Sequence, residues 1–149
     1  MNKEVDPVYR LNDVHKGFPD NKGPVRIMQD ISFTIRAGES VAIVGSSGCG
    51  KTTLLQMMAG LDTPSSGEII FRGENLQHLD WDAKSRLRNE GIGFVFQFHH
   101  LLPEFTTMEN VALPAMIRGE NKQAALDRAS RALEQTGIAR QAHQQVNTL

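Results

Sequence analysis

The stretch Gly45-Ser46-Ser47-Gly48-Cys49-Gly50-Lys51-Thr52 matches the phosphate-loop pattern G-x-x-x-x-G-K-[ST] at every specified position. Before it, the apolar residues 41–44 predict a buried strand, and after it residues 53–59 predict a helix that ends near Gly60. Strand, glycine loop and helix form the setting in which this motif binds phosphate, because backbone N–H groups then surround the phosphate oxygens. The stretch therefore predicts a site for a nucleoside triphosphate.

Individual side chains of the loop have separate expected roles. Lys51 would reach the β- and γ-phosphates, and the hydroxyl of Thr52 would ligate Mg²⁺. Cys49 stands where the backbone makes the phosphate contacts, so we interpret it as a small loop residue rather than a catalytic thiol.

Composition narrows the class of protein. A chain of 149 residues, 40% of them hydrophobic, can build one core. The net charge of −1 gives no electrostatic reason to expect nucleic-acid binding, and one cysteine excludes an internal disulfide. No run reaches the roughly 18 apolar residues of a transmembrane helix, and the N-terminus lacks a signal-peptide core. We expect a cytoplasmic protein that reaches a membrane only through a partner.

Alternating apolar and polar residues predict several short strands besides the one before the loop. Their turn-rich spacing beside a strand–loop–helix unit predicts a mixed sheet in an α/β fold. The expected strands are residues 9–14, 31–35, 40–44, 68–71 and 92–96.

Helical spacing of apolar residues and capping signals predict three further helices. Asp80 would cap the first, Thr107 would cap the second, and Gly137 would stop the third. We interpret Trp81 as a partly buried packing residue. The expected helices are residues 81–89, 108–117 and 122–136.

Four segments follow the phosphate loop in a fixed order. Together with the loop they resemble the first half of an ATP-binding-cassette (ABC) ATPase domain, over residues 9–149. The resemblance implies a P-loop NTPase fold of ABC type, with a mixed sheet around the strand–loop–helix core and an antiparallel N-terminal subdomain. The segments are Gly67-Glu68-Ile69-Ile70, Ile92-Gly93-Phe94-Val95-Phe96-Gln97, Leu101-Leu102-Pro103 and Thr107-Met108-Glu109-Asn110-Val111.

The sequence of residues 96–106 is similar to that of the ATPase subunits of bacterial lipoprotein-releasing transporters. The resemblance implies ATP and Mg²⁺ as ligands, with Phe18 stacking on the adenine ring and Tyr9 as a weaker candidate for that role. It also implies that Gln97 ligates Mg²⁺ and positions the attacking water, while Lys51 assists catalysis. The residues expected to contact the nucleotide are Phe18, Gly45, Ser46, Ser47, Gly48, Cys49, Gly50, Lys51, Thr52 and Thr53.

Partners are implied by the same resemblance. The loop after Gln97 is where such ATPases meet transmembrane permease subunits, which would hold this chain on the cytoplasmic face of the inner membrane. An intact domain also pairs with a second copy of itself. Packing of the loop on the domain's own core is the alternative. The apolar side chains that would face a partner are Phe98, Leu101, Leu102 and Phe105.

The family pattern is incomplete in these residues. The phosphate loop and the glutamine loop are present, but the signature motif, the Walker B strand ending in Asp-Glu and the switch histidine have no match, and Leu149 aligns with the first residue of the signature. We expect residues 1–149 to be the truncated N-terminal part of one ABC nucleotide-binding domain, deficient in hydrolysis by itself. Strands 40–44 and 92–96 would then have unpaired edges.

Two other functions are compatible with a phosphate loop. A small soluble P-loop kinase would need a basic lid, for which Arg86, Arg88 and Arg118 are available, and would transfer phosphate to a small acceptor. A non-catalytic nucleotide-binding module would bind ATP without turnover.

Overall fold

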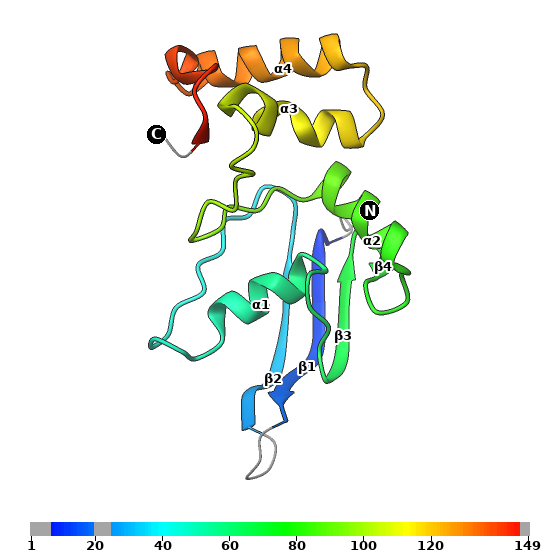
Figure 1. Ribbon diagram of the computed structural model, residues 1–149. Coiled ribbons are helices and arrows are strands. Elements are labelled where there is room, and N and C mark those ends of the chain that lie inside the picture. Colours follow the sequence, from blue (N-terminus) through cyan, green and yellow to red (C-terminus); the bar gives the residue numbers. More distant parts are fainter. Residues whose placement is uncertain (1–6, 20–24, 147–149) are drawn as a thin grey trace. The chain divides into compact units, whose positions relative to one another are not determined.

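The computed structural model describes residues 7–19 and 25–146; the residues aligned with the approach to the signature motif lie mostly outside this part, at Asn147 to Leu149. The chain divides into two compact units, Met1–Arg88 and Asn89–Leu149 (Figure 1). In the part of the chain that the structure describes, no helix is both long enough and apolar enough to span a membrane.

The first unit is built on a four-stranded antiparallel sheet with the strand order β2-β1-β3-β4. Strands β1 (Tyr9–Phe18) and β2 (Val25–Ile35) pair along most of their length. Strand β3 (Ser66–Phe71) pairs with the other edge of β1, and β4 (Glu74–Asn75) pairs with β3. The strands expected at residues 9–14, 31–35 and 68–71 are confirmed, and each is longer than expected.

Helix α1 (Lys51–Met58) lies across one face of this sheet (Figure 1). Its buried residues include Leu54 and Met57, which share one helical face and pack toward the strands. The Tyr9 hydroxyl donates a hydrogen bond to the Met58 carbonyl at 3.0 Å, joining β1 to the end of the helix. The buried apolar residues of this unit are Leu11, Val14, Met28, Leu54, Met57, Met58, Ala59, Ile69, Phe71 and Leu76.

Helix α2 (Trp81–Gly91) begins as expected, because the Asp80 carboxylate accepts a hydrogen bond from the Ala83 N–H at 2.7 Å. The expectation for Trp81 is wrong: the residue is 76% exposed. The helix has no buried residue, and its first position faces solvent, where the Arg88 guanidinium lies 5.4 Å from the indole centroid.

The strands expected at residues 40–44 and 92–96 are absent from the described part of the chain. An extended segment forms a strand only when a neighbouring segment hydrogen-bonds to it, and none does so here. One valine in each segment is open to solvent, Val44 at 87% and Val95 at 97% exposed, whereas Ile43, Ile92 and Phe94 are partly buried.

In the second unit, helices α3 (Thr107–Ile117) and α4 (Lys122–Gln135) pack side by side (Figure 1). Their interface is made of small residues, which allow the two backbones to approach closely. The short 3₁₀ helix Ala139–Gln141 follows α4. The buried residues between the helices are Ala112, Ala115, Ala125 and Ala129.

The start of α3 corrects the expected cap by one residue. Thr106, and not Thr107, is the N-cap, and its hydroxyl accepts a hydrogen bond from the Glu109 N–H at 3.3 Å. The Glu109 carboxylate accepts in return from the Thr106 N–H at 2.9 Å, which completes a capping box. The pattern Thr-x-x-Glu places the cap at Thr106, whereas Thr107 is buried inside the first turn.

Candidate functional site

The phosphate loop leads directly into helix α1. The helical hydrogen-bond ladder begins with the Leu54 N–H, which donates to the Gly50 carbonyl at 2.9 Å. The N–H groups of Lys51, Thr52 and Thr53 precede that ladder, so they remain for an anion at the positive end of the helix. This is the local geometry that the motif predicts.

Two glycines give the loop its shape. Gly48 has φ of +78° and Gly50, the N-cap of α1, has φ of +95°, values that side-chain-bearing residues rarely adopt. A Cβ on Gly50 would lie 2.6 Å from Ile27 Cγ2 on strand β2. The glycine thus lets the loop turn while the helix start rests against the sheet.

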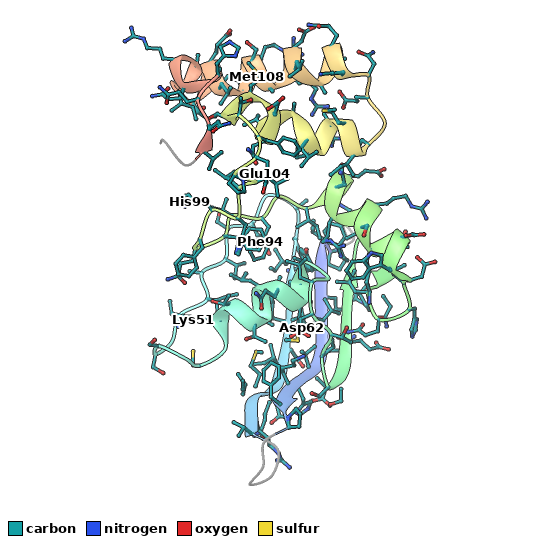
Figure 2. All side chains as sticks on the ribbon, in the orientation of Figure 1. Lys51, Asp62, Phe94, His99, Glu104 and Met108 are labelled. Atoms are coloured by element: carbon teal, nitrogen blue, oxygen red, sulfur yellow. The ribbon has the colours of Figure 1, made fainter. Side chains whose placement is uncertain are left out.

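Lys51 folds back over the loop that precedes it (Figure 2). Its Nζ donates to the Gly45 carbonyl at 3.0 Å and to the Ser46 carbonyl at 2.6 Å, and lies 3.7 Å from Cys49 Sγ. These contacts place an ammonium group at the mouth of the loop, beside the leading N–H groups of the helix. The positive charge and the helix end together favour a polyanionic ligand.

A hollow of about 160 Å³ opens at this point. Thr52 is exposed there, and Thr53 is half-buried. Ser46, Ser47 and Cys49 lie along the exposed outer part of the loop. The lining residues of the hollow are Ile27, Gly48, Gly50, Lys51, Thr52 and Thr53.

Phe18 lies at the end of strand β1, 42% exposed, beside a larger hollow of about 500 Å³. Met28 lines this hollow, and its neighbour Ile27 lines the one at the phosphate loop. Met28 Cγ also lies within 3.4 Å of the position that a Cβ of Gly50 would take. The two hollows are therefore neighbours across consecutive residues of β2.

Tyr9, the weaker candidate for base stacking, is used inside the fold. Its ring centroid lies 4.7 Å from that of Phe71, and its hydroxyl is bonded to the Met58 carbonyl. Burial raises the pKa of Tyr9 to about 12, while the nearby Arg72 guanidinium opposes the rise. Of the two aromatic candidates, only Phe18 lines the hollow.

Gln97 belongs to the second unit, where it is exposed on a bend between Phe96 and Phe98. The strand that was expected to end at this residue is not formed. Rings pack locally before and after it: the Phe94 and Phe96 centroids lie 4.5 Å apart, and those of Phe96 and His100 lie 4.8 Å apart.

The loop after Gln97 presents apolar side chains to solvent. Phe98 is 71% exposed, and the polar links within the loop come mainly from Asn110, whose amide bonds the Leu102 backbone on both its N–H and its carbonyl. Leu101, Leu102 and Phe105 are partly covered, at 42%, 39% and 37% exposed, so only Phe98 stands mostly in solvent. The exposed apolar residues of this patch are Phe98, Leu101, Leu102 and Phe105.

Sequence reasoning missed the residues behind Phe18. Lys16 lines the same hollow, and its Nζ donates to Asp62 Oδ1 and to the Thr63 carbonyl, each at 2.7 Å. Asp62 follows the end of α1 (Figure 2). A buried lysine on a strand and an aspartate 46 residues later carry no joint sequence signal, because the pairing of β1 with β3 and the docking of α1 bring them together.

Comparison with known proteins supports the motif analysis. A family model described as ABC transporter matches residues 28–149. The lipoprotein-releasing system ATP-binding protein LolD of Shewanella denitrificans is 45% identical over 128 residues, which cover 86% of this chain and 55% of LolD. LolD of Idiomarina loihiensis is 42% identical over 134 residues, covering 90% of this chain and 59% of LolD. The chain thus spans little more than half the length of these relatives.

A solved structure shares the fold. The ATP-binding cassette MJ0796, in a dimeric post-hydrolysis state bound to ADP and Pi, superposes with a TM-score of 0.88 at 31% identity. The match covers 95% of this chain and 62% of that one. A second dimeric structure of MJ0796, a bacterial ABC transporter cassette, gives a TM-score of 0.89 at the same identity and coverage. The chain therefore belongs to the ABC transporter family and has the α/β fold of its ATPase cassettes.

Proposed function

We propose that this chain binds Mg²⁺-ATP as the nucleotide-binding part of the energy-coupling subunit of an ABC transporter, one that releases lipoproteins from the bacterial inner membrane. The observation that carries the proposal is the hollow at the start of α1, where Lys51 and the leading N–H groups of the helix converge. The names of the LolD relatives support the choice of lipoprotein release.

The two neighbouring hollows suit the two ends of ATP. The triphosphate occupies the hollow at the phosphate loop, and the adenine ring enters the larger hollow beside Phe18, where a flat aromatic face is accessible. The exposed hydroxyl of Thr52 fits a hard cation, since oxygen is the ligand that Mg²⁺ prefers. Mg²⁺ bound by Thr52 would neutralise phosphate charge, and the expected role of Gln97 as a further ligand stays a prediction.

Partners fit the exposed surfaces of the chain. The apolar patch formed by Phe98, Leu101, Leu102 and Phe105 is suited to a transmembrane permease subunit, which would place the chain on the cytoplasmic face of the membrane. The dimeric cassettes among the structural relatives support pairing with a second copy.

Hydrolysis requires a general base that the sequence patterns of residues 1–149 do not provide. No acidic residue in them follows an apolar strand of the kind that supplies the catalytic glutamate in the family. Absence of a general base lowers a rate by about 10²–10⁴-fold. We expect the 149-residue chain to bind ATP without measurable phosphate release.

The test is calorimetric titration of the 149-residue chain with Mg²⁺-ATP. Lys51→Ala is expected to weaken binding by about 10- to 100-fold, because a charge-assisted hydrogen bond to phosphate is lost. Lys122→Ala, which removes an exposed ammonium from the second unit, is the matched control and should bind as the unchanged chain does. Equal affinities of the Lys51 variant and the control would overturn the assignment.

A further inference from the structure

Lys16 is a charged residue that is buried on strand β1, and the alternation of apolar and polar residues does not predict its burial. Its side chain is 9% exposed, on the face of β1 that carries Phe18 two residues later. A buried ammonium is unfavourable unless it is paired, and here Asp62 Oδ1 and the Thr63 carbonyl each accept a hydrogen bond at 2.7 Å. Two of its three donors are therefore fixed in direction.

The same ammonium lies over the ring of Phe18. Lys16 Nζ is 4.9 Å from the ring centroid, within the range of a cation–π contact. Phe18 ends its strand and is 42% exposed, so the neighbours that hold its ring are few. Lys16 and Phe18 both line the larger hollow.

The anchor of Lys16 is itself attached to the phosphate-loop helix. The Leu61 and Asp62 N–H groups both donate to the Gln56 carbonyl in α1, at 2.9 and 3.3 Å. Asp62 Oδ1 also accepts from the Thr63 N–H at 2.7 Å. One helix thus starts at the phosphate loop and, after its end, holds the aspartate that fixes Lys16.

We propose that Lys16, fixed by Asp62 and Thr63, is a positioning residue that orients the Phe18 ring for stacking on the base of the nucleotide. The inference rests on the proposed ATP binding and deepens it. A cation near one face of the ring leaves the opposite face for the base. Lys16 therefore affects recognition of the adenine and leaves recognition of the phosphates to the loop.

The test compares Mg²⁺-ATP with Mg²⁺-tripolyphosphate, which has the phosphates but no base. Lys16→Met keeps the length of the side chain and removes the ammonium. Because the loss of the ammonium weakens base stacking without removing the ring, we expect this variant to lose about five- to tenfold in ATP affinity, with tripolyphosphate affinity unchanged. Lys16→Arg, which keeps a cation over the ring, should restore most of the ATP affinity.

A double-mutant cycle with Phe18→Ala tests whether Lys16 affects ATP affinity through the Phe18 ring. In the Phe18→Ala chain, Lys16→Met should cause no further loss of ATP affinity. Equal losses for both ligands, additive losses in the cycle, or an unaltered ATP affinity of Lys16→Met would each overturn the positioning role. If the unchanged chain binds neither ligand, the proposed function itself fails. If the unchanged chain binds both ligands and the Lys16 variants give any of the contrary results above, only the positioning role fails.

Discussion

Replacement of Gly50 by alanine tests the geometry of the phosphate loop most directly. The residue has φ of +95° at the N-cap of α1, and a Cβ there would lie 2.6 Å from Ile27 Cγ2 and 3.4 Å from Met28 Cγ. Ile27 lines the hollow at the phosphate loop. Either the loop moves away from β2 or the Ile27 side chain moves, so the hollow changes shape in both cases.

The magnitude follows from two contributions. Left-handed backbone costs a non-glycine residue about 1–2 kcal/mol, and an additional carbon in a packed region costs about 1–3 kcal/mol. Gly50→Ala should therefore destabilise the chain by about 2–5 kcal/mol. Gly73→Ala is the matched control, because Gly73 has φ of +86° and nothing lies within 4 Å of its Cβ position. It should cost only the backbone contribution.

Urea unfolding gives the free energies, and Mg²⁺-ATP titration gives the functional effect. If the changed loop binds ATP less favourably by about 1.4 kcal/mol, the affinity is tenfold weaker. We expect a loss of this size for Gly50→Ala and no loss for Gly73→Ala. Removing the obstructing methyl group with Ile27→Ala should recover part of the stability in the double variant. Equal stabilities and unchanged ATP affinities of the two glycine variants would refute the packing of Gly50 against β2.

Three further perturbations test other parts of the chain. Tyr9→Phe should leave ATP affinity unchanged. Because the Tyr9 pKa rises from 10.0 to about 12 on folding, the unfolding free energy of the unchanged chain, measured in urea, should fall as pH rises above 10. The variant should not show this fall. Thr106→Ala should cost about 1 kcal/mol by removing the cap of α3. The hydrogen bonds from the Thr106 N–H and hydroxyl lower the pKa of Glu109. The stabilisation of the folded chain by these bonds is therefore present above the ordinary carboxyl pKa and disappears as pH falls below it. Glu109→Gln should abolish that acid dependence in thermal unfolding. The exposed Val44 and Val95 predict binding of a hydrophobic dye and marginal stability, and a sharp thermal transition without dye binding would contradict this.

The phosphate loop was predictable because its geometry is local. The pattern from Gly45 to Thr52 specifies a turn, two left-handed glycines and a helix start within eight residues, and the structure has each of them. The start of α2 at Asp80 was predictable for the same reason, since the capping hydrogen bond spans three residues. Phe18 was singled out through family resemblance alone; it lines the larger hollow, and its stacking on the base stays a prediction.

What escaped sequence reasoning depends on distant pairing. The apolar residues 41–44 have the pattern of a strand, yet a strand also needs a partner, and the pattern says nothing about whether the partner is present. Lys16 and Asp62 gave no signal because their meeting results from the pairing of β1 with β3 and the docking of α1. Trp81 was misjudged because a large apolar ring alone does not show which face of a helix is inward.

The missing strand at residues 41–44 affects how the position of the phosphate loop is fixed. On its N-terminal side the loop is joined to residues 41–44, which have no ladder in the described part of the chain, with Val41 53% and Val44 87% exposed. On its C-terminal side it continues into α1, which is packed on the sheet through Leu54 and Met57. The position of the loop must therefore be determined mainly by the helix and by the approach of Gly50 to Ile27.

The larger hollow, at which we propose that the base binds, depends on the same helix. Its walls come mainly from β1 and β2, which pair with each other along most of their length. Lys16, which lines it, is held by the segment that follows α1. An eight-residue helix is about 12 Å long, and its hydrogen bonds fix that length independently of the open sheet edge. Since both hollows depend on the position of one helix, we predict that the first unit provides most of the affinity for the nucleotide. We expect turnover to need, in addition, a general base that the sequence patterns of residues 1–149 do not provide, so binding and hydrolysis should separate experimentally in this chain.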